Sequence, residues 1–117
     1  MPYSDIPIIK KIYELYKLLY SYRKIIPKFE RYTIWQEILS VNMHILKKLI
    51  QLGNADPTNR HAKLADISSE VDLLKILIRL SFEINAIDNK KYIAIQTTIN
   101  EIGKMLGGWI KSTKNKS

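Results

Sequence analysis

The chain has no cysteine, and glycine and proline are scarce, with 4 residues of each among 117. The absence of thiols excludes disulfides, thiolate zinc sites and cysteine nucleophiles. No stretch is rich in Gly, Ser or Pro, so disorder is expected only near the two ends. Apolar residues make up 46% of the sequence, which is enough for one core. We therefore expect a single domain over residues 1–117.

Long apolar runs and a cleavable leader are also missing, which predicts a cytoplasmic protein that does not enter a membrane. Catalytic and metal-binding patterns are absent as well. His44 and His61 lack a cysteine or a Glu-x-x-His pair that would complete a metal site, and no serine lies in a Gly-x-Ser-x-Gly turn. We expect no cofactor, no metal and no enzymatic activity, although an active site assembled between subunits stays open.

Apolar residues recur at steps of three and four in several segments, which is the period of a helix and not of a strand. Pro27 should end the first helix, and Thr33 with Gln36 reads as a capping box for the second. Asp56 followed by Pro57 predicts the start of the third. The expected helices span roughly residues 6–26, 33–52, 57–87 and 89–111, followed by a frayed tail at 112–117.

Amphipathic helices joined by short connections favour an all-α, up-down-up-down antiparallel four-helix bundle, in which the first and last helices are neighbours. The formal charge of +8 lies at the two ends of the chain. Residues 1–28 hold six cations against two acids, residues 104–117 hold four cations against none, and the segment between is balanced. The bundle should therefore bring most of the positive charge to one side.

One face of the first helix alternates cations with aromatic rings. It consists of Lys10, Tyr13, Lys17, Tyr20 and Lys24. Lysines attract phosphates and release counterions, and exposed tyrosine rings stack on unpaired bases. This face therefore has the chemistry of single-stranded nucleic-acid binding. The alternative is a solvated lysine face whose tyrosines pack at a subunit contact.

The second helix carries a second apolar stripe beside its core stripe. Its members are Trp35, Leu39, Met43, Leu46 and Ile50. Such width predicts burial against a neighbouring subunit or a central position in the bundle, and the sequence leaves both open.

Two glycines lie one turn apart on the last helix, at Gly103 and Gly107. Side chains this small predict close contact with another backbone. The alternative is that Gly107 and Gly108 end or bend the helix while Trp109 folds back over the core.

Two segments resemble the Avd accessory proteins of diversity-generating retroelements, which belong to a four-helix-bundle group with proteins encoded in intervening sequences of bacterial 23S ribosomal RNA genes. These segments are Ile26–Thr33 and Glu101–Lys111, and helix lengths and order agree over nearly the whole chain. Two positions depart from the family. Ile26 stands before the proline where the family often has phenylalanine, and Trp35 occupies a position where a small residue is common.

The resemblance implies a non-catalytic subunit of a homopentameric ring that binds the reverse transcriptase of the retroelement and its template RNA or complementary DNA, in support of mutagenic retrohoming. The expected phosphate contacts are Lys10, Lys17, Arg23, Lys24, Lys28, Lys111 and Lys114, with Tyr13 and Tyr20 as stacking residues. Subunit contacts are expected at Trp35, Leu39, Met43, Gly103, Gly107 and Trp109. The alternatives are an RNA-binding protein of the intervening-sequence type and an oligomeric scaffold that binds another protein without nucleic acid.

Overall fold

The computed structural model describes residues 7–53 and 56–114, and all the regular structure in this part of the chain is helical. The elements are α1 (Pro7–Tyr22), the 3-10 turn η2 (Arg23–Ile25), α2 (Lys28–Arg31), α3 (Ile34–Leu52), α4 (Pro57–Glu83) and α5 (Asn89–Lys114). The prediction of an all-α chain with four long helices is confirmed. The short helix α2 lies between the first two of them.

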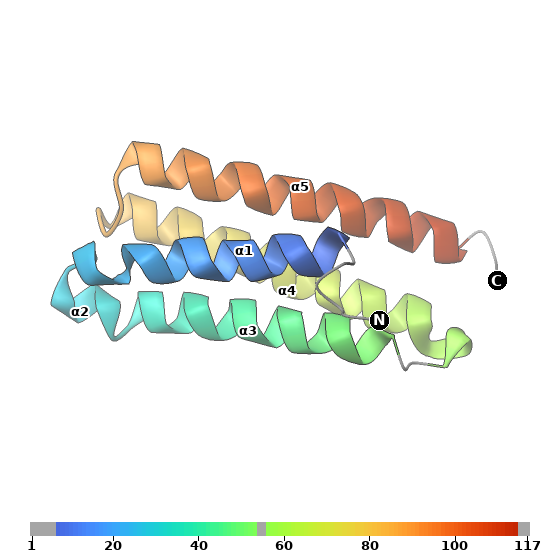
Figure 1. Cartoon of the computed structure of the whole chain (residues 1–117). Helices are drawn as coiled ribbons and strands as arrows, with labels where there is room; N and C mark the ends of the chain where they lie inside the picture. The colour runs from blue at the N-terminus through green and yellow to red at the C-terminus, as the bar shows by residue number, and fades with distance from the viewer. Residues whose placement is uncertain (1–6, 54–55, 115–117) are drawn as a thin grey trace.

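The four long helices lie side by side and run in alternating directions (Figure 1). Helix α1 contacts α3 and α5, and α4 contacts the same two helices from the other side. The described part of the chain measures 46 × 25 × 20 Å. Helix α2 and the turn between α4 and α5 lie at one end, which we call the α2 end, and the last turn of α5 lies at the opposite end (Figure 1).

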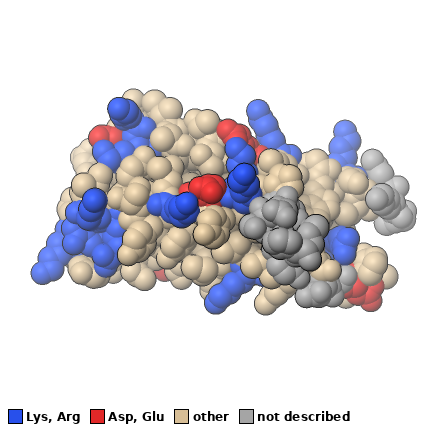
Figure 2. Space-filling view, in the orientation of Figure 1, with Lys and Arg blue, Asp and Glu red and all other residues tan. Residues whose placement is uncertain are grey.

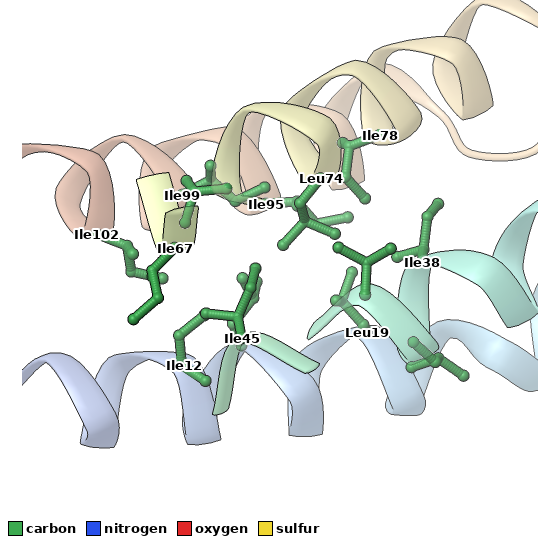
Figure 3. Close-up of a cluster of buried hydrophobic side chains, with 14 of the residues drawn as sticks. Ile12, Leu19, Ile38, Ile45, Ile67, Leu74, Ile78, Ile95, Ile99 and Ile102 are labelled. Carbon is green, nitrogen blue, oxygen red and sulfur yellow. The ribbon is translucent and has the colours of Figure 1, made fainter. Parts of the chain in front are cut away.

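Branched aliphatic side chains from all four long helices form one core (Figure 3). The deepest include Ile12, Leu19, Ile38, Ile45, Ile67, Leu74, Ile78, Ile95, Ile99 and Ile102. Isoleucine is a weaker helix former than leucine by a few tenths of a kcal/mol at most. Burial of each such side chain contributes about 1.5–3 kcal/mol, so packing decides the fold.

The helix starts follow the sequence signals only in part. Asp56 accepts a hydrogen bond from the Thr58 amide at 3.1 Å, directly before Pro57, so the predicted cap of α4 is confirmed. The capping box at Thr33 is wrong, because the Thr33 hydroxyl donates to the Phe29 carbonyl at 2.9 Å instead. Thr33 lies two residues after the end of α2, and its hydroxyl satisfies one of the carbonyls that the end of that helix leaves without a partner.

Helix α4 ends at Glu83, before the predicted end at residue 87. Asn85 adopts the left-handed conformation with φ of 65°, and its amide donates to the Phe82 carbonyl at 3.0 Å. The Ala86 amide donates to the Ser81 carbonyl at 2.8 Å. These two bonds form a Schellman motif, in which asparagine takes the place that glycine usually occupies.

The first and last helices also differ from their predicted ends. Helix α1 ends at Tyr22, and the chain continues only as η2 before Pro27 starts α2. Helix α5 runs through Gly107 and Gly108 to Lys114, so these glycines do not end it and residues 112–114 are helical. The rest of the predicted tail, residues 115–117, lies outside the described residues, as does residue 6.

Trp35 joins the end of α1 to the start of α3. Its side chain is fully buried, and its indole Nε1–H donates to the Leu19 carbonyl at 3.0 Å. Leu19 lies in the last turn of α1, where carbonyls lack a partner within the helix. Trp35 therefore has no surface to offer to a second subunit and stabilises its own.

Replacing Trp35 with phenylalanine keeps a buried ring but removes the donor to the Leu19 carbonyl. We expect the free energy of unfolding to fall by about 1–3 kcal/mol, measured by urea denaturation with circular dichroism. Trp109→Phe is the matched control, since Trp109 is only half-buried and forms no hydrogen bond with another described residue. Equal effects of the two substitutions would contradict this role of the indole.

Asn42 is a polar residue inside the core. It lies on α3, is fully buried, and neither its amide oxygen nor its amide nitrogen has a hydrogen-bond partner among the described residues. An unsatisfied buried polar group costs about 1–3 kcal/mol. Ser81, the other buried polar side chain described, donates its hydroxyl to the Leu77 carbonyl at 3.1 Å.

Asn42→Leu is expected to raise the free energy of unfolding by about 1–3 kcal/mol, because leucine has a similar shape and no polar atoms to satisfy. Thermal and urea denaturation would measure the gain. Ser81→Ala serves as the control and should give a smaller change, since the hydroxyl that it removes is already bonded. A loss of stability in Asn42→Leu would show that the amide is satisfied in solution.

Candidate nucleic-acid interface

The predicted face of α1 lies on the outer surface. Its members Lys10, Tyr13, Lys17 and Tyr20 lie on α1, and Lys24 follows in η2. All five are exposed, and we call this set the α1 stripe. The exposed fraction is 51% for Tyr13 and 60% for Tyr20. The Lys17 ammonium lies 5.7 Å from the centre of the Tyr13 ring and 3.8 Å from a carboxylate oxygen of Glu14. The stripe thus presents both ammonium groups and aromatic rings to solvent, although Glu14 partly offsets the charge of Lys17.

A second basic group continues the stripe around the α2 end, where Figure 2 shows Lys and Arg side chains gathered. Lys24 and Lys28 are exposed there and form no ion pair with another described residue. The Arg23 guanidinium lies 5.4 Å from the centre of the Tyr32 ring. Phe29 is 76% exposed beside them. Cations and exposed rings therefore lie together at this end too.

The rings at the α2 end were missed as site residues by the sequence analysis, which named Phe29 and Tyr32 only as part of the resembling segment. Their alternation with Lys28 and Arg31 is a usable signal, because apolar rings between cations in a turn have no core to enter. The site residues on the first helix were predicted from their helical spacing. That signal is too weak at the α2 end, because α2 has only four residues.

Arg31 shapes this end instead of facing solvent. Its Nη2 donates to the carbonyls of Lys24 and Ile26, both at 3.0 Å, and so closes the turn between α1 and α2. Hydrogen bonds from a charged donor are the stronger ones in proteins. Arg31 is therefore a positioning residue, and it holds the backbone that carries Lys24 and Lys28.

The antiparallel order of the first and last helices predicts Lys111, Lys114 and Lys116 near Lys10 and Lys11. For Lys111 this prediction is wrong, and Lys116 lies outside the described residues. Lys11 pairs with Glu101, which fixes the register between α1 and α5. Lys111 lies ten residues beyond Glu101, about 15 Å further along the helix axis. Lys111 is exposed, and Lys114 belongs to α5, although its side chain lies outside what the structure describes. Lys111 therefore forms a basic tip apart from the α1 stripe.

Helices α1 and α3 border a surface groove of about 420 Å³. Tyr16 and Tyr20 line it from α1, with ring centres 6.4 Å apart and ring planes inclined by 17°. Leu39 and Met43, two of the predicted subunit contacts, line it from α3. Leu39 is buried and Met43 half-buried, so the second stripe of α3 is used mainly within the subunit.

The remaining predicted subunit contacts lie on α5. A Cβ atom added at Gly103 would lie 3.3 Å from the Lys75 ammonium nitrogen, so this glycine makes room for a side chain of α4 in the same subunit. Nothing lies within 4 Å of the corresponding position at Gly107, which faces open space. Trp109 is half-buried, packs against the core and lines a hollow with His61 of α4.

An exposed apolar face on α4 and α5 was not predicted as a contact surface. Leu73, Ile76 and Leu80 follow helical spacing on α4, and Ile93 adds to them from α5. Ile76 is 64% exposed and Ile93 is 55% exposed, on either side of a shallow hollow of about 460 Å³. We call these four residues the α4–α5 face. In the sequence, the three residues of α4 lie next to the core stripe of that helix, so the apolar pattern alone does not separate exposed from buried positions.

Lys48 is a structural cation. It lies on α3 and donates to Asp66 at 2.7 Å and to Glu70 at 3.3 Å, both on α4. The hydrogen bond to Asp66 raises the pKa of Lys48 above its usual value of 10.5. The lysine is therefore charged at neutral pH, and its stabilising contribution is lost only as the pH rises through that raised pKa. Its charge is engaged between helices.

Within residues 7–53 and 56–114, no group of three or more His, Asp or Glu side chains is arranged to hold a metal ion. The two histidines lie on different helices, and His61 Nδ1 is 3.2 Å from the Thr113 hydroxyl oxygen. No helix in the same part of the chain combines the length and the apolar character that crossing a lipid bilayer requires.

A family model described as bAvd-like matches residues 7–113. The match spans all the long helices and contains both segments on which the resemblance depends. No curated protein matches the chain.

Proposed function

Because the chain belongs to the bAvd-like family, we propose that it is a non-catalytic accessory subunit of a diversity-generating retroelement. In this role it binds template RNA, complementary DNA or both, together with the reverse transcriptase of the retroelement. Nucleic acid binds along the α1 stripe and the α2 end. The observation that carries this proposal is the run of exposed cations and rings that begins on α1 and continues through Lys28 and Phe29.

The cations of this surface suit phosphates better than base edges. They are mostly lysines, which act as point charges on flexible stems and do not form the two-pronged contacts by which arginine reads guanine. Lys10, Lys24 and Lys28 form no ion pair with another described residue, so binding a polyanion breaks none of the described pairs. Binding of this kind depends steeply on salt and weakly on sequence.

We further propose that a second surface serves self-association. The α4–α5 face exposes large aliphatic side chains, and such patches mark contact surfaces. Helix α1 lies diagonally across from α4, so a partner seated on the α4–α5 face would not itself cover the α1 stripe (Figure 1). In this proposal the subunit is an up-down-up-down bundle within a homo-oligomeric ring, and the resemblance to Avd proteins implies five copies.

Charge reversal on the α1 stripe tests the nucleic-acid surface. In the variant Lys10→Glu, Lys17→Glu, Lys24→Glu, we expect the affinity for labelled RNA and single-stranded DNA to fall and the slope of log affinity against log salt to drop by about 1 for each lost phosphate contact. Fluorescence anisotropy at several salt concentrations measures both quantities.

The control is Lys63→Glu, Lys104→Glu, on exposed positions outside the stripe and the α2 end, and it is compared with the double variant Lys10→Glu, Lys17→Glu, which changes the net charge equally. It should keep the slope of the unmodified protein. Equal losses in the two variants would mean that net charge alone acts, and no affinity of the unmodified protein at low salt would favour the scaffold that binds only proteins.

Substitutions that introduce charge on the α4–α5 face test self-association. We expect Ile76→Lys combined with Ile93→Lys to lower the mass measured by light scattering to that of the 13.7 kDa monomer, with unchanged helicity. Ile25→Lys is a matched control, because Ile25 is 54% exposed at the α2 end, away from this face. An oligomer that survives the double substitution would place the contact elsewhere.

A further inference from the structure

The groove between α1 and α3 adds a feature that phosphate binding does not require. Resting on the nucleic-acid role proposed above, we propose that this α1–α3 groove takes up unpaired nucleobases of single-stranded RNA or DNA, while the lysines of the α1 stripe hold the phosphates. The two walls and the two ends of the groove each contribute a different part of this recognition.

The α1 wall offers aromatic surface. Tyr16 is half-buried, and Tyr20 beside it is 60% exposed, with the two rings nearly parallel and their centres 6.4 Å apart. The buried part of Tyr16 packs against the core, which limits the motion of the pair. A ring held in this way is a stacking platform for a base, and stacking accepts any base because each has a π-face.

The α3 wall offers hydrogen-bonding groups in a line. Gln36, Ser40 and His44 follow one another at steps of four on one face of the helix, and all three are exposed and line the groove. Their side chains form no hydrogen bond with another residue in the described part of the chain. An amide, a hydroxyl and an imidazole together supply donors and acceptors, which is what the Watson–Crick edge of an unpaired base requires.

A cation stands toward each end of the groove. Arg23 lines it from η2 near the α2 end, and Lys47 lines it from the far part of α3. From Gln36 to Lys47 the helix rises about 16 Å, several times the roughly 3.4 Å rise per base of a stacked strand. The groove is therefore long enough for more than one base, with positive charge at both ends for the flanking phosphates.

Paired bases fit this site poorly. In a duplex the base faces are stacked on one another and the Watson–Crick edges are occupied, so neither wall has a partner. The α1 stripe, in contrast, accepts phosphates of single or double strands alike. Tyr20 belongs to both the stripe and the groove, so a strand held by the stripe lysines lies next to the groove.

The test compares Tyr20→Leu with Tyr13→Leu, two exposed tyrosines of the same helix of which only the first lines the groove. Labelled single-stranded RNA, single-stranded DNA and duplex DNA are titrated by fluorescence anisotropy. We expect Tyr20→Leu to weaken single-strand binding by roughly 5- to 150-fold, to weaken duplex binding far less, to keep the salt slope, and to exceed the effect of Tyr13→Leu.

A second variant, Ser40→Leu, narrows the groove at an exposed position without removing a ring or a charge. It should also weaken single-strand binding, and a 2-aminopurine base in the strand should change its emission on binding the unmodified protein more than on binding this variant. The RNA and DNA arms distinguish the source of the bases, because a contact to the 2′-hydroxyl favours RNA.

Single-strand affinity that stays the same in both groove variants would overturn the groove and leave lysine-dependent binding intact. Equal losses for duplex and single strands in Tyr20→Leu would also overturn it, since Tyr20 would then act within the phosphate surface. If the unmodified protein binds no nucleic acid at low salt, the proposed function fails, and the groove fails with it.

Discussion

The hydrogen bond from the Trp35 indole to the Leu19 carbonyl fixes the end of α1 against the start of α3. Both partners sit directly beside groove residues, since Tyr20 follows Leu19 and Gln36 follows Trp35. The bond therefore fixes the position of Tyr20 on one groove wall relative to Gln36 on the other. Because it is fully buried, it acts in a low dielectric where it is stronger than at the surface. One interaction thus couples the core to the groove proposed to bind bases.

The turn between α1 and α3 depends on hydrogen bonds from a charged side chain. Arg31 donates hydrogen bonds to the carbonyls of Lys24 and Ile26. A half-buried cation therefore holds the backbone that carries the exposed cation Lys24. Like charges gathered at one end repel, and that repulsion works against the compact state. The aliphatic core that runs the length of the bundle offsets this cost, which explains how so basic an end remains folded without paired acids beside Lys24 and Lys28.

Helical periodicity predicted the long helices, because each buries a face with the 3.6-residue period that no strand shares. The α1 stripe was equally predictable, as the complement of that buried face. The second stripe of α3 was not assigned correctly for Trp35, because α3 packs between α1 and α4 and needs an apolar arc wide enough for two neighbours. The predicted helix ends failed at Asn85, where the end depends on left-handed geometry, and at Thr33, whose hydroxyl bonds to the preceding short helix instead of capping α3. The groove belongs to two helices at once, and no pattern within a single helix encodes it.

The diagonal placement of α1 and α4 separates the two proposed surfaces within one small subunit. Association through the α4–α5 face would repeat the α1 stripe and the groove around the assembly, each still open to solvent. A strand bound in one groove would then meet the next at a high effective concentration, so avidity rises without any new contact. The formal charge of +8 on each subunit would also add up across the ring, and phosphates neutralised on several subunits release counterions together. In the proposed ring, weak, sequence-tolerant sites on each subunit would in this way suffice for firm binding of a long single strand.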